Sequence, residues 1–91
     1  MTTLSAKLTF RVPHAQSLKD KRTVARGLID KARHKFNASV AEVGTQDAHQ
    51  TLTLGIAVVS GEHAHARAML DEIVRFLENH ADAELMEVEE G

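Results

Sequence analysis

The sequence predicts an α+β fold in which two helices cover one face of a four-stranded antiparallel sheet. Two observations predict it. Residues 3–12 and 51–59 alternate between apolar and polar side chains, as half-buried strands do, and residues 17–36 and 61–79 carry apolar residues at helical spacing. With two short strands added, the element order is βαββαβ. Because each apolar helix stripe needs a sheet face, we expect a ferredoxin-like two-layer sandwich with strand order 4-1-3-2.

Length and composition set the outer limits of the fold. A chain of 91 residues with 43% hydrophobic and 26% charged residues is expected to form a single domain, residues 1–91. It shows no cationic and apolar leader, and no apolar run near the roughly 18 residues of a membrane helix. The absence of cysteine excludes disulfides and thiolate metal sites. We therefore expect a cytoplasmic protein with no membrane association.

The first helix has a start signal and an apolar stripe. Ser17 can accept from the backbone N–H of residue 20, and the Asp20 side chain can reach back, which is a capping-box arrangement. Gly27 lies inside the helix, where we expect it to allow close packing on the sheet. The stripe comprises Leu18, Ala25, Leu28, Ile29, Ala32 and Phe36.

A row of basic side chains borders this stripe along one flank of the helix. The row comprises Lys19, Arg22, Arg26 and Arg33, spaced by three, four and seven residues. One interpretation is a solvated helix edge on which Asp30 neutralises Arg26 and Arg33. The other is a phosphate-binding surface, to which Lys7 and Arg11 of the first strand would add.

Lys21 falls on the apolar side of the same helix, where an ammonium group must reach water or a carboxylate. Glu42 is the candidate partner. It belongs to a short second strand at residues 38–43, for which we nevertheless expect Glu42 to point outward. The residues expected to point inward are Ser39, Ala41 and Val43.

The second half of the chain supplies the central strand, a helix and an edge strand. Residues 44–50 form a polar connection, and Leu52, Leu54, Ile56 and Val58 then mark the buried face of the clearest strand. Ser60 can cap the second helix, and residues 84–89 end the chain as an edge strand blunted by glutamates. The open face of the central strand carries Gly55, Ala57 and Val59.

No catalytic constellation is present, so we do not expect an enzyme, a cofactor or a metal. The sequence has no glycine-rich phosphate loop and no nucleophile motif. His63 and His65 are two residues apart on a helix, which directs their rings roughly 200° apart and away from a common metal ion.

Three stretches give the chain a resemblance to a known family. They are residues 17–22 (SLKDKR), 35–43 (KFNASVAEV) and 55–60 (GIAVVS). With them, nearly the whole chain resembles the YlxP-like family of small bacterial domains of unknown function. The resemblance implies a ferredoxin-like fold and, from the family's gene neighbourhood, an association with translation or the ribosome. After Gln46 and Asp47 the family often has a tryptophan two residues on, where this chain has His49.

Two function classes follow from these observations. In the first, the domain binds structured RNA, ribosomal or precursor, through the basic row, and recognises it by shape. The only aromatic residues are three phenylalanines, and their positions argue against base stacking on the sheet. In the second, the open sheet face with Gly55, Ala57 and Val59 is a homodimer or protein-docking surface.

Overall fold

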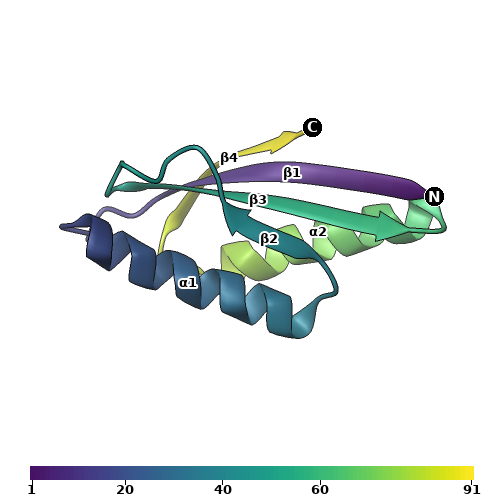
Figure 1. The fold of residues 1–91 in the computed structure, drawn as a ribbon, viewed down its shortest axis with the longest axis horizontal. Coiled ribbons are helices and arrows are strands. Elements are labelled where there is room, and N and C mark those ends of the chain that lie inside the picture. The colour runs from purple at the N-terminus through teal and green to yellow at the C-terminus, as the bar shows by residue number, and fades with distance from the viewer.

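The computed structural model describes residues 1–91 and has the predicted βαββαβ order (Figure 1). The elements are β1 (Thr2–Arg11), α1 (Leu18–Lys35), β2 (Ser39–Glu42), β3 (Thr51–Ser60), α2 (His63–His80) and β4 (Glu84–Glu90). The strands form one antiparallel sheet in the order β2-β3-β1-β4, and both helices lie on the same side of it. The predicted fold class, strand order and central position of residues 51–59 are confirmed.

The sheet is built around the long pairing of β1 with β3, which runs in continuous register from Thr2 opposite Ser60 to Arg11 opposite Thr51. β4 lies along the other side of β1, and its register shifts between Thr9 and Phe10. The shift inserts one extra residue, Met86, into β4, which is a β-bulge at this edge of the sheet.

The core lies between the sheet and the helix layer. β1 and β3 contribute alternate residues such as Leu8, Phe10 and Leu54, all fully buried. α1 contributes mainly small side chains, Ala25 and Ala32, together with Leu28. α2 contributes Ala66, Leu70, Ile73 and Leu77.

The starts of the two helices differ from each other. At α1 Ser17 caps the helix as predicted, since its Oγ accepts from the Asp20 N–H at 3.1 Å. Asp20 reaches back as well, but it accepts from the N–H of Gln16 at 2.9 Å and not from that of Ser17, so the capping box is incomplete. The predicted cap of α2 is wrong, because β3 continues through Ser60 and the N-cap residue is Glu62. The Ser60 hydroxyl instead accepts from the Glu62 N–H at 3.2 Å, which tightens the turn before the helix.

The face assignment of β2 is also wrong. Val40 is 1% exposed, and Glu42 points to the same side, whereas Ser39 and Ala41 are exposed. The register explains this, since Val40 and Glu42 stand opposite inward-facing residues of β3.

Gly27 does not serve close packing, contrary to the expectation. It is exposed, and a Cβ atom added there would meet nothing within 4 Å. The small core residues of α1 are Ala25 and Ala32 on the opposite side of the helix. The fold therefore does not require a glycine at this position.

Side chains occupy the free edge of the sheet at β2. The Val43 N–H donates to Thr53 O of β3 at 2.9 Å. Because successive residues of a strand direct their backbone groups to opposite edges, the carbonyls of Val40 and Glu42 point away from β3, toward the free edge of the sheet. Arg33 donates to Val40 O at 2.7 Å, and the Gln46 side chain donates to Glu42 O at 3.3 Å. Both outward acceptors of this short strand are thus satisfied within the chain.

Candidate functional site

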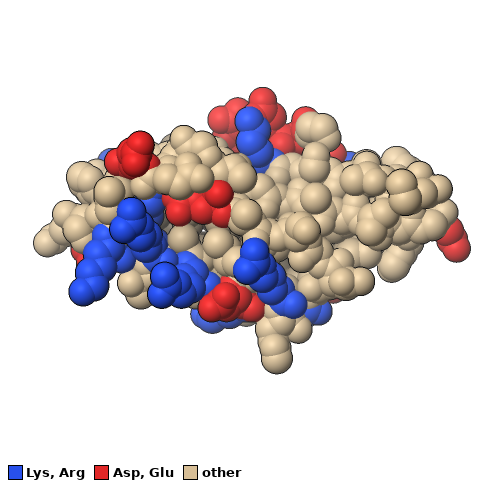
Figure 2. Space-filling view, in the orientation of Figure 1, with Lys and Arg blue, Asp and Glu red and all other residues tan.

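The predicted basic row lies along the flank of α1 that borders β2, and Lys and Arg side chains gather there in the space-filling view (Figure 2). Lys19, Arg22, Arg26 and Arg33 are all exposed. Asp30 forms no ion pair in the structure, so its predicted neutralisation of Arg26 and Arg33 does not take the form of a direct salt bridge. None of the four cations has a carboxylate within ion-pair distance, and Figure 2 shows acidic side chains interspersed among the basic ones on this face.

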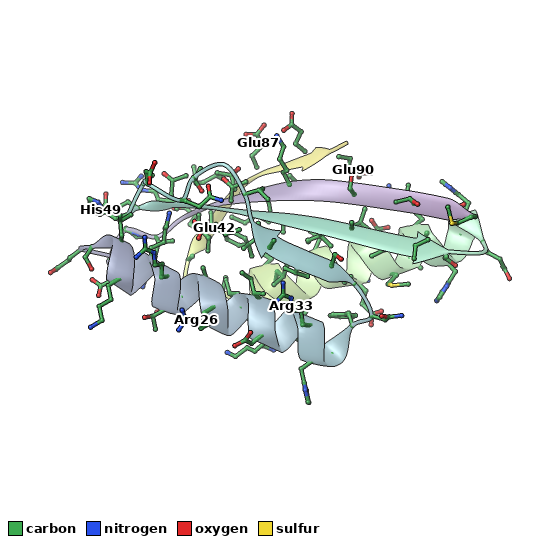
Figure 3. All side chains as sticks on the ribbon, in the orientation of Figure 1. Arg26, Arg33, Glu42, His49, Glu87 and Glu90 are labelled. Carbon is green, nitrogen blue, oxygen red and sulfur yellow. The ribbon has the colours of Figure 1, made fainter.

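The four side chains of the row differ in the contacts that they make. The Arg33 guanidinium donates to the carbonyl of Val40, and Arg26 lies about two turns earlier on α1 (Figure 3). Lys19, Arg22 and Arg26 make no side-chain hydrogen bond and no ion pair. Arg33 is consequently oriented in advance, and the other three side chains remain mobile donors that can adapt to a ligand.

Lys21 is a structural residue and takes no part in this row. Its side chain is fully buried, and its Nζ lies 2.9 Å from Oε2 of Glu42, which confirms the predicted pairing. The same ammonium donates to the carbonyls of Thr45 and Thr51, the latter at 3.2 Å. Lys21 thereby ties α1 to β2 and to both ends of the connection before β3.

Lys7 and Arg11 lie on a different element from the basic row, although Lys7 lines the same trough as Arg33. Both belong to β1 and face the open side of the sheet, opposite the helix layer. Lys7 pairs with Glu89 at 3.2 Å, and Arg11 stands across from Glu84 in the β1–β4 register. Arg11 is therefore remote from the row, and Lys7 is near Arg33 but already paired with a glutamate.

The open sheet face forms a shallow trough of about 680 Å³ that spans all four strands. Gly55 and Ala57 line it together with Ser5 and with Ala41, which was expected to point into the core. A Cβ atom on Gly55 would lie 3.2 Å from the Val43 side chain, so the glycine keeps the trough deep at that point. Val59, at the end of β3, is 56% exposed.

Arg67 carries an ion-pair network that sequence reasoning missed. Its guanidinium contacts Glu90 of β4 at 2.5 Å and Asp71 of α2 at 2.8 Å. Hydrogen bonds to Glu90 and then to Asp71 raise the pKa of Arg67 above its ordinary value. Of these two contacts, only that with Asp71, four residues further along the helix, can be predicted from the spacing in the sequence. This cation is matched by carboxylates and is not available to an anionic partner.

The remaining candidates make few contacts. His49 is exposed in the connection between β2 and β3 and makes no hydrogen bond or ion pair (Figure 3). No three His, Asp or Glu side chains are grouped so as to hold a metal ion. No helix is long and apolar enough to cross a lipid bilayer.

Comparisons with known proteins place the chain among uncharacterised relatives. The family described as "Protein of unknown function (DUF503)" matches residues 3–90. The uncharacterized protein YlxP of Bacillus subtilis (strain 168) is 34% identical over 70 residues, which cover 77% of this chain and 76% of that protein. The solution NMR structure of a de novo designed ferredoxin-fold protein aligns with 94% of this chain and 82% of its own. Its TM-score is 0.56 at 18% identity, a likeness of fold alone.

Proposed function

We propose, from the premise that this chain belongs to the DUF503 family of proteins of unknown function, that it binds structured RNA through the basic row of α1. One observation supports the proposal above the others. Four cations without an ion-pair partner are aligned on one flank of α1, whereas the other unpaired cations, Arg11, Lys31, Lys35 and Arg75, lie outside this row. An anionic partner could therefore contact several free basic groups along one flank of α1.

The geometry of the row suits phosphate contacts. From Lys19 to Arg33 it extends about 21 Å along the helix, at roughly 1.5 Å per residue. Arginine and lysine in such a row bind phosphate oxygens and position the protein without reading bases. Specificity would then come from the shape of the RNA, and the gene neighbourhood of the YlxP-like family makes ribosomal or precursor RNA the natural probe.

The salt dependence of binding tests this proposal directly. Four phosphate contacts displace about four counterions, so log affinity plotted against log salt should have a slope of roughly −3 to −4. The measurement is fluorescence anisotropy with labelled ribosomal RNA fragments at several salt concentrations. Absence of binding at ~50 mM salt, or a slope near zero, would rule the proposal out.

A second candidate function is self-association through the open sheet face. The trough described above, with the exposed Val59 beside it, favours this reading. We expect a weak homodimer in sedimentation at ~100 µM protein, and a monomer for Val59→Arg, which adds a charge to that face. A strict monomer for the natural sequence at this concentration would remove the candidate.

A further inference from the structure

A groove between the two helices carries aromatic and basic groups together. It is a shallow, open depression of about 520 Å³ on the helix layer. α1 supplies Asp30, Lys31, His34 and Lys35 to its lining, and α2 supplies Phe76 and His80. This groove lies in the helix layer between the last turns of α1 and α2, and none of the four residues of the basic row lines it.

The aromatic part of the groove is a ready-made stack. The rings of Phe76 and His80 lie with centroids 4.1 Å apart and planes 24° from parallel. His80 Nδ1 lies 2.9 Å from the Phe76 carbonyl, and a carbonyl can only accept, so Nδ1 carries the proton and the ring is held in place. His80 is nevertheless exposed. A flat ring with one face on Phe76 can receive another flat ring on its outer side.

The charged part of the groove favours an anion. Lys31 and His34 are exposed and form no ion pair, while the Nζ of Lys35 lies 5.0 Å from the centroid of Phe76. Asp30 is the single carboxylate in the lining. The groove therefore offers two ammonium groups and two imidazoles against one acid beside an aromatic stack.

A ligand that is both planar and anionic matches these two properties. We propose that the groove receives an unpaired base of the bound RNA, which stacks on His80 while its phosphates contact Lys31 and Lys35. This inference rests on the proposed RNA binding and adds to it a preference for RNA with unpaired nucleotides over fully paired duplex.

A path for the RNA strand across α1 is also present. A smaller hollow of about 210 Å³ adjoins the groove and shares Lys31 and His80 with it. Gly27 lines this hollow and has open space where a side chain would be. Asp82 also lines this hollow, so the open space at Gly27, and not the charge of the hollow, would let a strand pass from the basic row to the groove.

The experiment compares two RNAs of equal length, a hairpin with 2-aminopurine in its loop and a fully paired duplex. We expect tighter binding of the hairpin and a change in 2-aminopurine fluorescence as the base stacks. His80→Ala should weaken hairpin binding about tenfold, in the range known for base–aromatic stacks, and leave duplex binding unchanged. His80→Phe, which keeps a flat ring, should retain the preference for the hairpin.

The control is His63→Ala, which removes an exposed histidine at the other end of α2, about 25 Å away along the helix. Equal binding of both RNAs, or unchanged hairpin affinity in His80→Ala, would overturn the inference while leaving the proposed function intact. If neither RNA binds at ~50 mM salt, the proposed function fails, and this inference fails with it. Circular dichroism of each variant confirms that a lost affinity does not reflect unfolding.

Discussion

Replacing Lys21 by methionine is expected to lower the free energy of unfolding by about 3–5 kcal/mol, the usual cost of breaking a buried ion pair from one side. The side chain is 0% exposed, and the change would leave the Glu42 carboxylate without its only partner. The carbonyls of Thr45 and Thr51 would also lose their donor. Urea unfolding followed by circular dichroism measures the loss, which is a large fraction of the roughly 5–15 kcal/mol typical of whole proteins.

Two further variants distinguish the loss of the buried ion pair from the loss of any lysine on α1. Lys19→Met, on the exposed side of the same helical turn, should change stability by less than about 0.5 kcal/mol. Adding Glu42→Leu to Lys21→Met removes the orphaned charge and should restore much of the lost stability. Equal stability of Lys21→Met and the natural protein would show that the buried ion pair does not hold α1 against β2.

The second large effect concerns RNA affinity. Changing Arg22 and Arg26 together to alanine should remove about two units from the salt slope and weaken binding roughly hundredfold at ~50 mM salt. Because phosphate contacts do not read bases, the loss should be similar for different RNAs. Anisotropy titrations of the double variant over a range of salt concentrations measure both quantities.

A charge-matched control separates a local effect from the change in net charge. Arg11→Ala with Arg75→Ala removes two exposed arginines that form no ion pair and lie outside the basic row. This pair should leave the slope nearly unchanged. Equal losses in the two double variants would show that general electrostatic attraction, and not the flank of α1, holds the RNA.

The long strands and helices are predicted well from the sequence because their apolar patterns repeat over many residues. Ten residues of alternation define β3, and eighteen residues of helical spacing define α1. The four residues of β2 are too few to fix which side chains face the core, and the charged residue Glu42 lies on the inner face, where it pairs with Lys21. The sequence suggested both that Glu42 pairs with the buried Lys21 and that Glu42 points to solvent. These two expectations exclude each other, and only the packing of α1 against β2 decides between them.

The same contrast holds for the candidate site. The basic row follows from helical spacing, but which cations remain free depends on pairs that are remote in sequence, such as Lys7 with Glu89 and Arg67 with Glu90. The stack of Phe76 and His80 has the four-residue spacing of helix neighbours. Its position beside Lys35 depends on how α1 lies against α2, which no local pattern encodes.

Amyloid-type growth starts when a foreign strand forms ladder hydrogen bonds with an open sheet edge. On β2, such a strand would first have to displace the Arg33 guanidinium from Val40 O and the Gln46 carboxamide from Glu42 O. At the opposite edge, the exposed glutamates of β4 repel a second copy of the same edge. Templated fibril growth on the folded protein is therefore opposed at both edges, and a seed would have to capture the chain while it is unfolded.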